Sequence, residues 1–247
     1  MIYHNFIKFS GCTSVVANPV AHTGECDHNV DIVFVLDSSG SIGSDGWENM
    51  KNYVKKTVQA LHEVGTNTQL GLVSFDDSVD EDHVIPLTAH EDKARFLRDL
   101  DALDLRGGST RIDLGMKRAL DLFKGDHRPH AHNTVVLLTD GLPDSNTPTL
   151  QEIGQWFHDK HIRVIVAGIG DGVDSDGLRS MTLDHSTTHT MYFPVDHIND
   201  IARPQTVDNI LEGCNFAYGK FKKKVNLFPI TLISNLNSHQ ILIRIQN

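Results

Sequence analysis

The sequence predicts an α/β fold: a doubly wound, mostly parallel sheet of six strands with one antiparallel edge strand, and helices on both faces. Short apolar runs rich in β-branched residues alternate with longer segments whose apolar residues recur at helical spacing. Strands and helices that alternate in this way form parallel sheets, because each helix returns the chain to the same end of the sheet. We expect one domain over residues 28–215, between an N-terminal arm (1–27) and a basic, irregular C-terminal tail (216–247).

Six segments have the composition of strands. The first of them, 31–36, is nearly all apolar and is bounded by acidic residues, as is typical of a strand buried on both faces. Pro86 indicates an edge strand, since proline has no N–H to donate to a neighbouring strand. The predicted strands are 31–36, 70–75, 83–87, 134–138, 163–169 and 189–193.

Five further segments have helical periodicity. In the first of them apolar residues recur every three or four positions from Trp47 to Leu61, and Ser44 is the expected N-cap. The predicted helices are 44–62, 91–102, 111–123, 149–159 and 198–213.

The charge of the chain restricts its partners. The 247 residues carry a formal net charge of −10, and all five basic residues after Tyr218 lie in a tail without acidic residues. Residues 1–218 therefore hold 17 basic against 32 acidic residues, a formal charge of −15. Such an acidic body argues against nucleic acid or an anionic membrane as the main partner. The basic run Lys220–Lys224 could bind heparin or anionic lipid, although we expect a solvated tail there.

Cysteine content and hydropathy bear on the compartment. Three cysteines, Cys12, Cys26 and Cys214, are too few for a disulfide scaffold and lack zinc-site spacing. No run of 18 apolar residues predicts a transmembrane segment. The start of the chain lacks the continuous apolar run of a secretion signal, so that either the chain is intracellular or its true start lies elsewhere.

Polar residues gather where predicted strands end. Ligands of open parallel sheets bind at the carboxyl ends of strands, at the point where the strand order reverses. D-x-S-x-S follows the first strand, a G-G-S-T segment opens the helix 111–123, and T-D-G follows the strand 134–138. Carboxylate and hydroxyl oxygens suit a hard divalent cation such as Mg²⁺. The sequence therefore predicts a site for such a cation at these strand ends.

These motifs resemble the metal-ion-dependent adhesion site of von Willebrand factor A domains, the fold shared by integrin inserted domains. The resemblance covers about 190 residues, with all five ligand positions in order. It implies that the metal ligands are Asp37, Ser39, Ser41, Thr110 and Asp140, some of them through water. T-D-G-L-P-D-S and V-A-G-I-G are also similar to the A domains of gliding adhesins of the thrombospondin-related anonymous protein type, and to matrilin-like A domains. The resemblance implies Mg²⁺ (or Mn²⁺ or Ca²⁺), and a protein partner whose Glu or Asp carboxylate completes the coordination shell.

The resemblance also implies an extracellular adhesion protein without catalytic activity. In the family, movement of the last helix tunes affinity, and the helix would here end at Cys214. Cys26 and Cys214 are placed like the cysteines that tie the ends of extracellular A domains together, so a disulfide between them is favoured over two free thiols. Several acidic residues surround the expected ligands and suggest a basic partner surface; they are Asp76, Asp77, Asp80, Glu81, Asp82 and Asp144. Sulfated glycans are a further candidate ligand.

Several other functions are compatible with parts of the sequence. A matrix module that binds without strict metal dependence and an intracellular scaffold both remain open. An Mg²⁺-dependent phosphotransferase is disfavoured, because that chemistry usually needs a second acid two residues after the nucleophile, where Ser39 stands. His127, His130 and His132 could hold a soft metal, but a solvated loop is the simpler interpretation. The segment Asp171–Asp176 lacks the final glutamate of a calcium loop.

Overall fold

The computed structural model describes most of the predicted domain. The residues it describes are 29–63, 67–87, 93–125, 128, 131–140, 143–145, 147–169, 174–182, 190–193, 207, 210, 231–234 and 241–244. The arm 1–27, the three cysteines and the basic run Lys220–Lys224 lie outside them. No helix among the described residues is long and apolar enough to cross a membrane.

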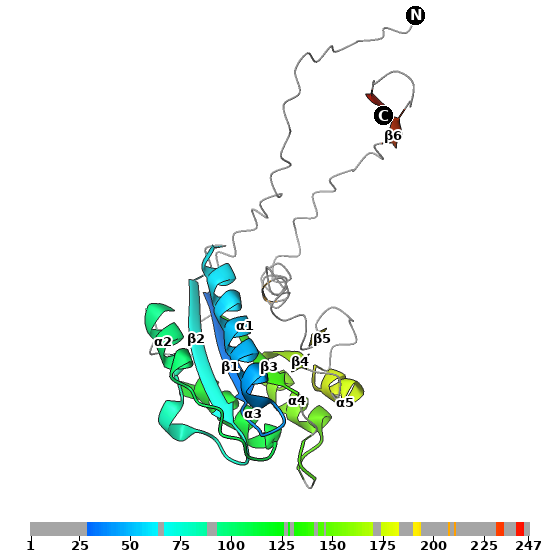
Figure 1. Ribbon diagram of the computed structural model, residues 1–247. Coiled ribbons are helices and arrows are strands. Elements are labelled where there is room, and N and C mark those ends of the chain that lie inside the picture. Colours follow the sequence, from blue (N-terminus) through cyan, green and yellow to red (C-terminus); the bar gives the residue numbers. More distant parts are fainter. Residues whose placement is uncertain are drawn as a thin grey trace, which may run out of the picture.

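A parallel sheet of five strands in the order β2-β1-β3-β4-β5 forms the centre of the domain (Figure 1). Chain order reverses at β1, which has β2 on one side and β3 on the other, so that the loops following β1 and β3 lie at a switch point. The strands are β1 Asn29–Asp37, β2 Asn67–Phe75, β3 His132–Thr139, β4 Arg163–Ile169 and β5 Thr190–Phe193.

The predicted antiparallel edge strand 83–87 is wrong. A short 3₁₀ helix, η1 (Glu81–His83), occupies the start of this segment, and only Ile85 pairs with β2. Ile85 and Leu72 exchange two backbone hydrogen bonds of 2.9 Å. Because η1 takes up the start of the segment, the described residues make a single bridge here, and the described sheet has five parallel strands, not six.

Helices cover both faces of the sheet (Figure 1). Alternate residues of β1 point to opposite faces, and both faces are apolar. Val30, Ile32 and Phe34 pack with α1 and α2, whereas Val33 and Val35 pack with α3, α4 and α5. The helices are α1 Gly43–Glu63, α2 Lys93–Asp101, α3 Ile112–Gly125, α4 Leu150–His158 and α5 Ser175–Met181.

Two helix predictions need comment. Helix α1 begins at Gly43, one residue earlier than predicted, so Ser44 lies inside the first turn and is not the N-cap. Of the predicted helix 198–213, the described residues are Val207 and Ile210, both helical and both buried against the α1 face of the sheet.

The region predicted as an irregular tail contains two short strands. Here β6 (Thr231–Ser234) pairs antiparallel with β7 (Ile241–Arg244) in a separate two-stranded sheet.

Candidate metal site

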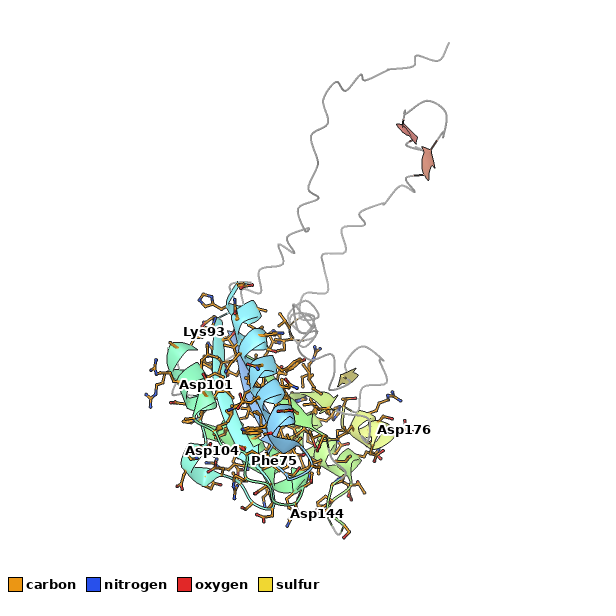
Figure 2. The ribbon with its side chains drawn as sticks, viewed as in Figure 1. Phe75, Lys93, Asp101, Asp104, Asp144 and Asp176 are labelled. Atoms are coloured by element: carbon orange, nitrogen blue, oxygen red, sulfur yellow. The ribbon has the colours of Figure 1, made fainter. Side chains whose placement is uncertain are left out.

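Three loops meet at the carboxyl end of the sheet. The first follows β1, the second leads into α3, and the third follows β3. Phe75, the last residue of β2, and Asp144 of the third loop both lie toward this end of the molecule in Figure 2. Because neighbouring parallel strands end at the same edge, side chains distant in sequence are brought together here.

Asp37, the last residue of β1, is fully buried. Its Oδ1 accepts a hydrogen bond from the backbone N–H of Ser39 at 2.9 Å, and its Oδ2 accepts one from the Thr139 hydroxyl at 2.6 Å. Burial raises the pKa of Asp37 to about 6, although these hydrogen bonds oppose the shift. Among the described residues no Lys, Arg or His forms an ion pair with this carboxylate, so this part of the chain supplies no counterion for its negative charge.

A chain of hydroxyl and carboxylate oxygens continues from the first loop to the third. The hydroxyls of Ser39 and Ser41 are 3.2 Å apart, and the Ser41 hydroxyl donates to Oδ1 of Asp140 at 3.0 Å. Ser39 is buried and Ser41 is exposed, so the chain leads from the core to the surface. Burial raises the pKa of Asp140 as well, against the hydrogen bond from Ser41. The structure thus brings four of the five predicted ligands together.

The fifth predicted ligand, Thr110, is buried on the second loop, which is joined to the first by backbone hydrogen bonds. The N–H of Gly107 donates to the Ser38 carbonyl at 2.8 Å, and the N–H of Gly40 donates to the Gly108 carbonyl at 2.9 Å. Gly107 has a φ of 86°, a conformation that favours glycine. These bonds place the loop of Thr110 against the loop of Ser39 and Ser41.

The second loop is also joined to the third. The N–H of Asp144 donates to the Thr110 carbonyl at 3.1 Å, and the Asp144 carboxylate accepts from the Ser109 hydroxyl at 2.7 Å and from the Thr110 N–H at 3.4 Å. From the sequence alone, Asp144 is only one of several acidic residues near the predicted ligands.

Other acids near the site are paired, which sequence alone did not reveal. Asp76 forms an ion pair with Arg106 at 3.1 Å, and Glu81 forms one with Arg118 at 2.9 Å. The acidic surroundings are therefore partly neutralised within the chain. Thr139 was also missed as the partner of Asp37, although its place before Asp140 in T-D-G was the available signal.

The donor set fits a hard divalent cation. Two carboxylates and three hydroxyls offer only oxygen atoms. Within the described part of the chain, no group of three His, Cys, Asp or Glu side chains gathers into an alternative metal site. Of the histidine cluster, His132 begins β3, whereas His127 and His130 lie outside the described residues.

Comparison with known proteins agrees with this architecture. The chain is 27% identical to the collagen alpha-1(XXI) chain of Xenopus laevis over 66% of its own length and 16% of that chain. It is 26% identical to matrilin-1 of Mus musculus over 72% of its length and 36% of that protein. The chain thus spans well under half of the curated relatives it matches.

Solved structures give the same fold. Proximal thread matrix protein 1 from the mussel byssus superimposes with a TM-score of 0.63 at 25% identity, covering 75% of this chain and 48% of that one. A form of the same mussel protein described as having a zinc-occupied MIDAS motif gives a TM-score of 0.64 at 23% identity, over 76% of this chain and 48% of that one.

The family model of the von Willebrand factor type A domain matches residues 31–206, from the third residue of β1 through every strand of the parallel sheet. The match spans most of the chain and contains all three loops of the candidate site. The chain therefore belongs to the von Willebrand factor type A domain family.

Proposed function

We propose that residues 28–215 form an adhesion domain that binds a protein ligand through a divalent cation held by its three loops. The ligands would be Asp37, Ser39, Ser41, Thr110 and Asp140, some of them through water. One observation carries the proposal: Asp37 is fully buried, has no counterion among the described residues, and lies at the inner end of a chain of oxygen atoms that reaches the surface.

The chemistry of the five residues favours Mg²⁺, with Mn²⁺ and Ca²⁺ as alternatives. Asp37 and Asp140 would supply the negative charge, and the serine and threonine hydroxyls are neutral ligands that leave the cation incompletely neutralised. A bound cation would supply an electrophilic position that accepts a carboxylate oxygen of the partner. Thr139 would hold Asp37 in place through its 2.6 Å hydrogen bond.

The proposed setting is the extracellular matrix or the cell surface. Support comes from the collagen and matrilin chains among the relatives. The proposal includes a disulfide between Cys26 and Cys214, and mass measurement of the purified chain with and without reductant would test it. A loss of two protons without reductant is expected; two free thiols in protein from an oxidising compartment would count against this setting.

We propose binding without catalysis. Ser39 stands two residues after Asp37, where a phosphotransferase of the aspartyl type would need an acid. A phosphatase assay with the Asp37→Asn variant tests this alternative. Mg²⁺-dependent turnover that is lost in the variant would replace the adhesion proposal with an enzymatic one.

The decisive experiment has two steps. Calorimetric titration of the purified chain with Mg²⁺, Mn²⁺, Ca²⁺ and Zn²⁺ asks whether a single site exists and whether Asp140→Ala removes it. Binding to a panel of matrix proteins and sulfated glycans is then measured in Mg²⁺ and in EDTA. Asp77→Asn is the matched control, since Asp77 is an exposed acid beside the site that the proposal does not use.

The expected result is one-to-one metal binding, and ligand binding that is lost both in EDTA and in Asp140→Ala but kept in Asp77→Asn. Ligand binding that is indifferent to EDTA would favour the metal-independent matrix module. Absence of any divalent cation binding by the wild-type chain would contradict the proposal.

A further inference from the structure

Asp76 is a buried carboxylate that the proposed metal site does not use. It directly follows β2, and its side chain is 5% exposed. Its neighbour Phe75 is held against the first loop, because the N–H of Ser38 donates to the Phe75 carbonyl at 2.7 Å. Asp76 therefore stands at the edge of the site, attached to the loop of Ser39 and Ser41 through one residue.

Both carboxylate oxygens and the backbone carbonyl of Asp76 accept hydrogen bonds or ion pairs from residues of the second loop. Oδ1 pairs with the Arg106 guanidinium at 3.1 Å, and Oδ2 accepts from the N–H of Gly108 at 3.3 Å. The backbone carbonyl of Asp76 accepts from the N–H of Arg111 at 2.9 Å. These three contacts bracket Thr110, with Arg106 and Gly108 before it and Arg111 directly after it.

Arg106 also binds the turn that follows Asp76, and so joins this turn to the second loop a second time. Its guanidinium donates to the Ser78 carbonyl at 3.1 Å and to the Ser78 hydroxyl at 2.8 Å. The N–H of Ser78 in turn donates to Oδ1 of Asp76 at 3.2 Å. The turn after β2 and the second loop are thus joined by a closed set of hydrogen bonds centred on one carboxylate.

The close approach of the two segments requires glycine at position 108. A Cβ atom on Gly108 would lie 2.6 Å from Oδ2 of Asp76, well inside van der Waals contact. The two positions of the G-G-S-T segment therefore favour glycine for different structural reasons. Gly107 has a positive φ, and Gly108 leaves room for the Asp76 carboxylate because it has no Cβ atom.

We propose that Asp76 is a positioning residue for the metal site, which sets the location of Thr110 by holding the second loop on both sides of it. The inference rests on the proposed function, because it concerns the affinity of the same site. Asp76 acts through the loop backbone and not by contact with the ion. Replacing a residue that orients a metal ligand without touching the metal typically lowers metal affinity about 10- to 100-fold.

The test is a double-mutant cycle read out as Mg²⁺ affinity by calorimetry. Asp76→Asn should weaken Mg²⁺ binding at least about tenfold, because an amide cannot hold both the guanidinium and the Gly108 N–H as a carboxylate does. Asp77→Asn removes the same charge one position later from an exposed side chain, and should change the affinity by less than about threefold because solvent screens it.

The cycle separates positioning from general destabilisation. If Asp76 acts through Thr110, then in a Thr110→Ala background Asp76→Asn should cause little further loss of Mg²⁺ affinity. The unfolding free energy, measured in EDTA, should fall by the same amount in both backgrounds. Gly108→Ala, which keeps the charge of Asp76 but displaces it, should reproduce the loss of affinity.

Three results would overturn the inference. These are equal Mg²⁺ affinity of Asp76→Asn and the wild-type chain, equal losses in Asp76→Asn and Asp77→Asn, and an undiminished loss in the Thr110→Ala background. In each of them the wild-type chain binds Mg²⁺, so the proposed function would stand. A wild-type chain that binds no divalent cation would instead overturn both together.

Discussion

Strand β1 carries two fully buried aspartates, one near each end, and their carboxylates have different partners. Asp31, near the amino end, is paired with Arg128, which also donates to the Val30 carbonyl at 2.9 Å and the Asn67 carbonyl at 3.1 Å. Asp37, at the carboxyl end, has only hydroxyl and backbone donors among the described residues. Both lie on the same face of the strand, six residues apart.

This difference in partners suggests a structural role for the charge of Asp31 and a functional role for the charge of Asp37. A buried carboxylate needs compensation, because its transfer from water is costly. At Asp31 the compensating cation is part of the chain, and it joins the amino ends of β1 and β2. At Asp37 we propose that the compensating cation comes from solution. Substitutions at the two positions should therefore shift the unfolding free energy in opposite directions.

The largest effect is expected at the amino end. Arg128→Met leaves Asp31 buried without its partner, and should lower the unfolding free energy by about 3 kcal/mol, as for other broken buried ion pairs. Urea denaturation would measure the loss. The matched control is Arg118→Met, whose partner Glu81 is exposed, with an expected loss below about 1 kcal/mol. Equal losses in the two variants would contradict a special role for the Asp31 pair.

At the carboxyl end the sign should reverse. Asp37→Asn removes a buried charge whose pKa is raised from 3.8 to about 6. Two pKa units correspond to about 3 kcal/mol, which the altered hydrogen bonds reduce, so the metal-free chain should gain roughly 1–3 kcal/mol at pH 7. Denaturation in EDTA measures the gain, with Asp31→Asn as the destabilising counterpart. A destabilised Asp37→Asn variant would indicate that the charge of Asp37 is compensated within the chain.

The pH dependence follows from the same shift. Between pH 3.8 and about 6 the unfolded chain releases the Asp37 proton while the folded chain keeps it, so the unfolding free energy falls as the pH rises. The contribution of this one group is at most about 1.4 kcal/mol per pH unit, and it levels off above about pH 6. Denaturation of the wild-type chain and of Asp37→Asn in EDTA at several pH values isolates it as the difference between the two curves. A difference that does not change with pH would contradict the raised pKa.

The smallest effect on stability is expected at the surface. Ser41 is exposed, and Ser41→Ala removes one hydrogen bond to Asp140, so the unfolding free energy should change by less than about 1 kcal/mol. Mg²⁺ affinity should nevertheless fall, since a proposed ligand is lost. Calorimetry and urea denaturation of the same preparation give both numbers. A stability loss without an affinity loss would remove Ser41 from the ligand set.

Much of the fold could be predicted because it rests on local patterns. The run from Ile32 to Leu36 is apolar on both faces, and the structure places it at the centre of the sheet. The loops at the strand ends could be predicted as neighbours once the sheet was predicted to be parallel, since a parallel sheet brings the carboxyl ends of its strands together. The edge strand 83–87 was wrong because composition does not show how many residues of a short apolar segment pair with a neighbouring strand, and here only Ile85 does so.

The parts that could not be predicted depend on contacts between distant residues. Asp31 and Arg128 are 97 positions apart, and nothing near either residue indicates the pair. Asp76 was visible only as one acid among several, because its meaning comes from Arg106, Gly108 and Arg111 on another loop. Thr139 could have been found, since a hydroxyl at the end of β3 must lie beside the end of β1.

The hydrogen bonds at the carboxyl end of the sheet join the three loops in a circle. The first loop is bonded to the second through Gly40 and Gly107, the second to the third through Asp144, and the third back to the first through the Ser41 hydroxyl. Opening one loop therefore breaks bonds to both of its neighbours. In hydrogen–deuterium exchange, the amides of Gly40, Gly107 and Asp144 should behave as one cooperative unit, exchanging together and more slowly than exposed loops of similar length.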